Sequence, residues 1–341
     1  MAREMWGLKL VVMVLGLLVL APETMQLHVD HPLHGVVQRI NDKSGPFLAI
    51  IISSSRDERI LLESGHFDHD QANPQLVIAG RRVHIGRFRG APALVTRDEH
   101  PLANVAATAQ ALLDAFKIIG FIHYGPAGVV TDKINIGDVV VPESVALTGV
   151  WRWQEHESSL GSDQEELPSL RFGDYNLPKP GENKLGSVQH QRVTLYTPSG
   201  SNQLAFWLPV NRDWHRIASE IKGIMMEKCI NGDMSTCVLK EGELIHEAKG
   251  ASSDIYVRNE AYADFLQKLG ADVVDTTSTA VVATAIANGV PNIVFRSAAN
   301  KPGMEVDNEM KNVAARNVLQ AVVKFVDLIS PPMPAPRTSC Y

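Results

Sequence analysis

The residues of this chain that could do chemistry gather between Val273 and Gly303. An Ala-rich stretch there predicts a buried helix, and residues 289–291 (Gly-Val-Pro) end it before a short apolar strand that reaches Arg296. Open α/β sheets bind ligands where strands end on polar residues. We therefore expect a site here, in which Arg296 faces an anion or a structural carboxylate.

A second candidate lies after the apolar strand predicted for residues 121–124. The sequence Gly125-Pro126-Ala127-Gly128 predicts a turn there, and the backbone N–H groups of such a turn could hold an anion. Gly125 and Gly128 are therefore candidate substrate-binding residues. An ordinary connection between a strand and a loop is the alternative.

Strands alternate with helices along the chain, which predicts an α/β fold. We expect a single three-layer α/β/α domain with a mixed, mainly parallel central sheet over residues 31–330. The predicted strands are 47–52, 75–79, 82–88, 93–95, 121–124, 138–142, 145–150, 206–210, 253–257 and 292–295. The predicted helices are 33–43, 104–116, 213–224, 259–269 and 308–329, besides the one in the 273–303 segment. An acidic, Pro- and Gly-containing stretch over about 155–192 predicts an exposed insertion, and the Pro-rich residues 331–341 predict a disordered tail.

The N-terminus has the pattern of a secretory signal. A basic residue precedes an apolar run over residues 8–21, which is short for a membrane span. We predict a signal peptide over residues 1–24 and, after its removal, no stable membrane span. The protein is then extracellular or vacuolar. An uncleaved anchor and a buried helix rank lower, because nothing basic follows the run.

The net charge, the cysteines and the His/Asp clusters indicate which ligands and cross-links the chain can have. The net charge of −6, without a basic stripe, argues against nucleic-acid binding, and no nucleic-acid partner is expected. Cys229 and Cys237 bracket a turn-rich loop and are predicted to form a disulfide, which leaves Cys340 over; three free thiols are the alternative. The His/Asp clusters lack the spacing of known metal sites, so no metal is expected.

Several segments together resemble the nucleoside phosphorylase/nucleosidase superfamily, on its plant branch of bark storage proteins. They are His123–Gly128, Asn135–Pro142, Leu147–Gln154 and Gly250–Val257, in this order. The resemblance spans residues 33–330. It implies a small-molecule nucleoside as ligand, phosphate as a possible co-substrate, no other cofactor, and a homo-oligomer.

Two positions depart from that family's pattern. Where the family has Met-Glu, this chain has Thr276-Thr277, and where it has a base-protonating Asp, this chain has Asn300. Thr277 cannot act as the ribose-holding carboxylate, and Asn300 forms hydrogen bonds but delivers no proton. We therefore predict a nucleoside-binding scaffold with weak or lost cleavage of the N-glycosidic bond. The alternative is an active purine nucleoside or cytokinin riboside phosphorylase or nucleosidase that uses Asp275 or Asp254 as its acid.

The resemblance also suggests roles for three further residues. Asp57 lies near a family acid that activates water or holds phosphate, although its charged neighbours favour a solvated loop. Tyr256 could stack on the base, with a core aromatic as the alternative. Asn104 stands in a region where the family has a glycine-rich turn, and capping of the following helix by Asn104 or Asp98 is favoured over ligand binding.

Overall fold

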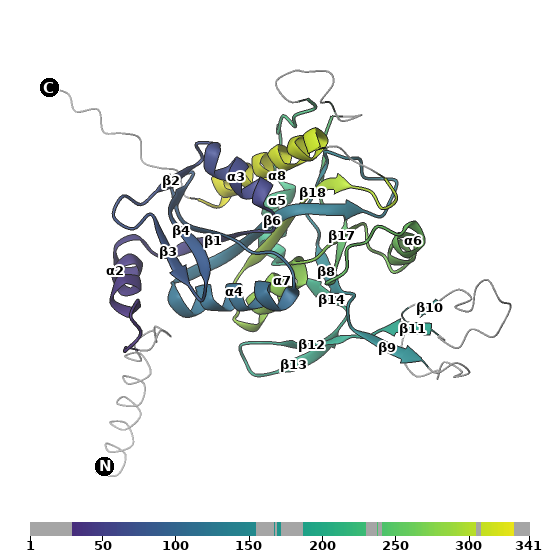
Figure 1. The fold of residues 1–341 in the computed structure, drawn as a ribbon, viewed down its shortest axis with the longest axis horizontal. Helices are drawn as coiled ribbons and strands as arrows, with labels where there is room; N and C mark the ends of the chain where they lie inside the picture. Colours follow the sequence, from purple (N-terminus) through teal and green to yellow (C-terminus); the bar gives the residue numbers. More distant parts are fainter. Residues whose placement is uncertain are drawn as a thin grey trace, which may run out of the picture.

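The apolar strands of this chain form one large mixed sheet in the computed structural model, shown in Figure 1. The structure describes residues 29–154, 167, 169–171, 187–229, 237, 241–304 and 308–330. The strands of the large sheet are β1 Phe47–Ile52, β2 Phe67–His69, β3 Gln75–Ile78, β4 Arg81–Phe88, β5 Ala91–Arg97, β6 Ile118–Val129, β7 Val139–Val140, β8 Ser144–Leu147, β14 Trp207–Pro209, β15 Leu244–Ile245, β16 Lys249–Ser252, β17 Val273–Asp275 and β18 Asn292–Asn300. Two small sheets contain β9 Trp151–Gln154, β10 Ser169–Arg171 and β11 Ser187–His190, and β12 Val193–Tyr196 and β13 Asn202–Ala205.

The large sheet mixes parallel and antiparallel pairs throughout and is not mainly parallel as predicted: β8, β16 and β17 are parallel to one another, whereas β17 is antiparallel to β6, and β4 is antiparallel to β5. Strand β1 lies between β5 and β6 and is parallel to both, so that Ile50 pairs with Val95 on one side and Ile122 on the other. Strand β18 joins β6 in the same direction. Every residue of β1 is buried, as expected of a strand covered on both faces.

Helices cover both faces of the sheet. They are α2 His34–Ser44, α3 Ser55–Glu63, α4 Leu102–Ala115, α5 Arg212–Ser219, α6 Glu260–Lys268, α7 Ser278–Ala287 and α8 Asn308–Ile329. One apolar cluster packs α3, α5 and α8 against the sheet, and a second packs α2, α4 and α7 against its other face (Figure 1). The predicted three-layer α/β fold is thereby confirmed.

Most predicted elements are present, with three corrections. The predicted turn at 125–128 is wrong, because β6 continues through Val129. The predicted strand 253–257 is also wrong: the strand is β16, which ends at Ser252, and the following residues form a loop. The charged segment after β1 is helix α3 and not a solvated loop. Ser54 caps this helix by accepting hydrogen bonds from the backbone N–H groups of Arg56 and Asp57.

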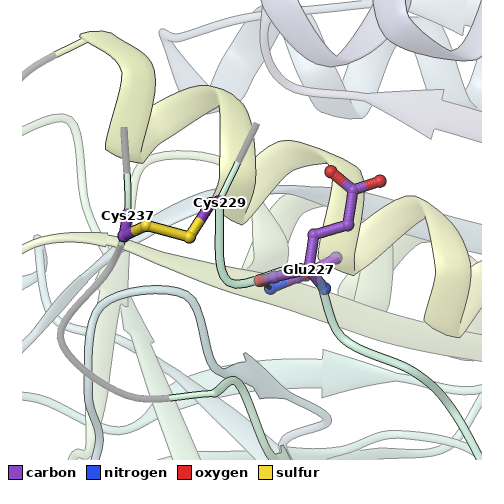
Figure 2. Close-up of a disulfide and its surroundings, with 4 residues drawn as sticks. Glu227, Cys229 and Cys237 are labelled. Carbon is purple, nitrogen blue, oxygen red and sulfur yellow. Dashed lines mark hydrogen bonds between the residues drawn. A yellow bond between two sulfur atoms is a disulfide. The ribbon is translucent and has the colours of Figure 1, made fainter. Parts of the chain in front are cut away.

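The predicted disulfide joins Cys229 to Cys237 and lies beside α8 (Figure 2). Asn317 of α8 anchors the chain just before it, since its Oδ1 accepts from the N–H of Glu227 at 2.6 Å and its Nδ2 donates to the carbonyl of Gly137 at 2.9 Å. The predicted signal peptide and Pro-rich tail lie outside the described residues, as does most of the 155–192 insertion. Within the described ranges, no helix has the length and apolar character needed to cross a membrane.

Candidate functional site

A cavity of about 1000 Å³ opens where β6, β17 and β18 meet the loops that follow β16 and β18. Its lining residues are Ser53, Pro126–Gly128, Ile255–Arg258, Val274–Thr277, Asn300–Met304, Met310 and Lys311. Thus the cavity brings together Gly128, Tyr256, Thr277 and Asn300 from the predicted set. Its lining does not include Gly125, Arg296, Asp57 or Asn104. Volumes of this size are ordinary for ligand pockets.

Arg296 lies behind the cavity wall, fully buried within a group of polar side chains. Its guanidinium donates to the hydroxyl oxygens of Ser53 at 2.8 Å, Thr277 at 2.9 Å and Ser278 at 2.7 Å. Its Nη2 also lies 2.5 Å from Nε2 of His123. We call Arg296 and the side chains bonded to it the polar centre. Because these donors are committed to the protein, Arg296 does not present them to a ligand.

Asp275 balances the charge of Arg296 in the polar centre. Its Oδ2 lies 3.1 Å from Nε of Arg296, and its Oδ1 accepts from the backbone N–H groups of Thr277 and Ser278 at the start of α7 and from the hydroxyl of Ser252. Burial by itself would raise the pKa of Asp275, but Arg296 and these hydrogen bonds hold it below its usual value. Asp275 is therefore ionised and bonded, which leaves it unsuited to deliver a proton.

His123 is a member of the polar centre that sequence reasoning did not single out. Its Nδ1 lies 2.9 Å from the carbonyl oxygen of Ile51, and its Nε2 faces Arg296 and, at 3.0 Å, Thr277. Burial and the positive charge of Arg296 lower the pKa of His123 well below its usual range. The ring is thus neutral, with the proton on Nδ1, and its Nε2 accepts. It follows that the Thr277 hydroxyl is engaged by internal partners.

The glycines at 125 and 128 serve close packing within β6. A Cβ on Gly125 would lie 2.0 Å from Oγ of Ser53, and one on Gly128 would lie 3.1 Å from Nδ2 of Asn300. Gly125 therefore lets Ser53 and Arg296 approach the strand, and Gly128 gives space to the Asn300 amide. Since both residues belong to a paired strand, the predicted anion-holding turn does not exist.

Asp57 is buried, with 2% of its surface exposed, and is not the solvated residue that its neighbours suggested. The pattern Ser54-x-x-Asp57 fits a helix N-terminus and could have indicated α3 from the sequence. Burial raises the pKa of Asp57, although Arg296 opposes that rise. Its Oδ1 and the hydroxyl of Tyr124 have no hydrogen-bond partner in the described structure.

Asn104 lies in the first turn of α4, exposed and away from the cavity lining. The expectation that Asn104 or Asp98 caps this helix is wrong, because the helix begins at Leu102 and neither side chain accepts from its free N–H groups. Instead Asp254, from the loop after β16, accepts from the N–H of Leu102 at 2.7 Å. Asp254 is thereby occupied in joining two loops.

Tyr256 stands at the cavity mouth, 70% exposed, in edge contact with His100 at 5.1 Å between ring centroids. The structure thus excludes the alternative of a core aromatic. Val257, the next residue, packs into an apolar cluster with Phe265, so the loop has a fixed base beneath its exposed ring. We call the lining residues 255–258 and 300–304 together with Lys311 the cavity rim.

Asn300 ends β18 and lines the cavity. Its side chain forms no hydrogen bond with another described residue, so the amide is available to a ligand. Asp275 is the sole carboxylate in the described lining, and the rim instead carries Arg258, Lys301 and Lys311. The described residues contain no group of three or more His, Cys, Asp or Glu that could hold a metal.

The fold is that of known nucleosidases. The structure is similar to futalosine hydrolase of Helicobacter pylori, with a TM-score of 0.53 and 16% identity, over 82% of this chain and 95% of that one. It is also similar to 5′-methylthioadenosine/S-adenosylhomocysteine nucleosidase of S. pneumoniae, with a TM-score of 0.55 and 15% identity, over 84% and 100% of the two chains. At this identity the likeness concerns the fold.

Sequence relatives give the family. The phosphorylase superfamily model matches residues 48–185. Bark storage proteins A and B of Populus deltoides are each 34% identical over 323 residues, which is 93% of this chain and 99% of theirs. The chain therefore belongs to the phosphorylase superfamily, as a bark storage protein-like member.

Proposed function

We propose that this protein is a nucleoside-binding scaffold of the bark storage protein type, in which cleavage of the N-glycosidic bond is weak or lost. The observation that carries this proposal is the state of the carboxylates around the cavity. Asp275, the carboxylate of the described lining, is bonded to Arg296 and to the start of α7. The resemblance implies a ribose-holding carboxylate at Thr277 and a base-protonating Asp at Asn300, and neither of the residues present has a carboxyl group.

Cleavage of an N-glycosidic bond needs help at two places. The departing base takes up a proton or hydrogen bonds, and the ribosyl group develops positive charge that a carboxylate can stabilise. Asn300 can bond the edge of a base but cannot protonate it. The hydroxyl of Thr277 is neutral and is bonded to Arg296 and His123, so it offers the sugar neither a negative charge nor a free acceptor. Loss of a general acid alone costs roughly 10²–10⁴-fold in rate.

The test is a panel of adenosine, inosine and cytokinin ribosides, incubated with the purified protein with and without phosphate. We expect binding by calorimetry and turnover at least about 10²-fold below that of an active superfamily nucleosidase measured beside it. Turnover comparable to that reference would contradict the proposal. Absence of binding to every nucleoside in the panel would contradict it as well.

A second candidate function, an active nucleosidase or phosphorylase, is favoured by one observation. Asp57 is buried with a raised pKa and an unpartnered Oδ1, and it lies in the field of Arg296. Such a carboxyl group is suited to hold or move a proton. Because Asp57 does not line the cavity, it would act through the polar centre. If the panel reveals turnover, Asp57→Asn should lower it, while Asp254→Asn, at the cap of α4, should leave the rate within about threefold.

Maturation and assembly complete the proposal. We propose removal of residues 1–24, delivery to the extracellular space or the vacuole, and a homo-oligomeric state, as the superfamily resemblance implies. Mass spectrometry of the mature N-terminus and sedimentation of the purified protein test these points. A mature chain that retains the apolar run of residues 8–21 would contradict the first.

A further inference from the structure

The cavity rim carries positively charged side chains, and binding of a neutral nucleoside does not require them. Arg258, Lys301 and Lys311 line the cavity. Among the described lining residues, Asp275 is the one that carries a carboxylate. That carboxylate is 3% exposed and paired with Arg296, so its charge is neutralised inside the wall. The described lining is thus cationic toward a ligand.

The cations belong to segments that are held together. Arg258 follows Tyr256 in one loop, and Lys301 follows Asn300 in the other. The N–H of Gly303 donates to the carbonyl of Arg258 at 3.2 Å, which links the two loops across the rim. Lys311 joins them from the first turn of α8. An aromatic ring, a free amide and cationic side chains therefore face one cavity.

The charges on the rim are available to a ligand. Arg258 and Lys311 form no ion pair with another residue in the described ranges. Lys301 pairs with Asp132, whose side chain is 93% exposed. An exposed pair of this kind contributes little to stability, because water screens both charges, so a ligand anion can replace Asp132. Phosphate oxygens are strong acceptors for such cations.

We propose that the cavity binds a nucleoside monophosphate in preference to the neutral nucleoside. The base stacks on Tyr256 and accepts or donates hydrogen bonds at Asn300, and the phosphate is held by Arg258, Lys301 and Lys311. This inference rests on the proposed function, since it requires a nucleoside in the same cavity.

Calorimetry at low salt with two matched pairs, AMP with adenosine and IMP with inosine, tests the proposal. We expect at least one nucleotide to bind about 10-fold more tightly than its nucleoside, a difference of about 1.4 kcal/mol. Added salt should reduce that ratio by screening. Inorganic phosphate alone is the third arm, and it should bind more weakly than the nucleotide.

The variant that removes all three charges, Arg258→Gln with Lys301→Gln and Lys311→Gln, should lower the ratio to about threefold or less. Lys324→Gln removes an exposed charge from the same helix α8, outside the cavity lining, and should preserve the ratio. Equal affinity for nucleotide and nucleoside in both pairs would overturn this inference and leave the proposed function standing. Binding of neither would overturn both.

Two further outcomes would also overturn the inference. Inorganic phosphate that binds as tightly as the nucleotide would assign the rim to free phosphate. A ratio that survives in the triple variant would place the phosphate elsewhere. Thermal denaturation of each variant accompanies the titrations, so that loss of fold is separated from loss of binding.

Discussion

The polar centre and the cavity rim lie side by side and use similar residues in opposite ways. Arg296 is fully buried and donates to Ser53, Thr277 and Ser278, with Asp275 as its counter-charge. Arg258, in the rim, is exposed and has no ion-pair partner among the described residues. One arginine is committed to the fold, and the other is open to solvent and ligand.

The difference follows from the cost of burying charge. A buried guanidinium without partners is strongly unfavourable, so each donor of Arg296 must be satisfied by the protein before any ligand arrives. The exposed rim carries no such requirement, because water solvates its cations. Hence the polar centre is bonded within the protein, while the cations of the rim stay exposed at the cavity.

The largest expected effect is that of Arg296→Met. Removal of the guanidinium leaves Asp275 buried without its counter-charge, which should destabilise the fold by about 3–5 kcal/mol. Chemical denaturation at pH 7 measures it. The matched variant Arg258→Met should change stability by no more than about 0.5 kcal/mol, as for most exposed positions. A loss below about 1 kcal/mol for Arg296→Met would remove the distinction between the two regions.

The next effect concerns His190 and the aromatic rings around it, which include Phe265, a residue of the apolar cluster that also holds Val257 of the rim. His190 of β11 is buried, 5.7 Å from the ring of Phe265 and 5.8 Å from that of Trp151 between centroids, and burial lowers its pKa to about 4. A histidine with a depressed pKa stabilises the fold above pH 6.5, and that stability is lost as the pH falls toward 4. The loss should reach at most about 3 kcal/mol.

Denaturation between pH 7 and pH 4 checks this window. His190→Phe should flatten the decline, because the variant has no ring to protonate within the aromatic cluster. His31→Phe, at an exposed position near the start of the described chain, should leave the decline unchanged. An equally steep decline in His190→Phe would show that other groups govern acid stability.

A smaller change should follow from Asn300→Asp, which introduces an acid of nearly the same size at the cavity. If the missing acid limits cleavage, turnover of adenosine or inosine should rise by about 10²-fold, equal to about 2.7 kcal/mol. Single-turnover assays measure it. Asn292→Asp, at the other end of β18, is the matched control and should produce no gain. Unchanged turnover in Asn300→Asp would mean that Thr277 or the rim charge limits the reaction.

The smallest effect should be that of Tyr256→Ser. Loss of a stacking ring from the rim should weaken nucleoside binding by about 10-fold, near the lower part of the range for base–aromatic stacking. Stability should stay nearly unchanged, because the ring is 70% exposed. Tyr196→Ser, on the distant hairpin strand β12, should leave the affinity unchanged. Calorimetry with adenosine measures the affinity of both variants, and an equal affinity would contradict the stacking role of Tyr256.

Much of the fold could be predicted from the sequence, because local periodicity and burial agree over long segments. The helix predicted for 308–329 has those bounds in the structure, and β1 occupies the predicted residues 47–52. The predictions are wrong where the same local sequence pattern is compatible with two different structures. Glycine at 125 indicated a turn, but its actual use is to let Ser53 approach the strand. The charged residues after Ser54 predicted a solvent-exposed loop. In the structure Ser54 caps helix α3, and Asp57 in that helix is buried.

The candidate site was predicted in part. Thr277 and Asn300 do line one cavity with Gly128 and Tyr256. The partners of Arg296 were not predictable, because His123 and Ser53 lie more than 150 residues away in the chain and meet it through strand pairing. The roles of Asp275 and Asp254 as helix caps were likewise missed, since each cap depends on the fold.

By itself, the sequence determined the α/β architecture, the family and the disulfide, and it predicted that Thr277 and Asn300 stand in place of two family carboxylates. These follow from residue types and local spacing, which the chain carries before it folds. Tertiary structure alone decided that Asp275 is bound to Arg296, that Asp57 is buried, and that Arg258, Lys301 and Lys311 face one cavity. Charge and proton affinity depend on burial and on neighbours distant in the chain, and only the folded packing brings those neighbours together.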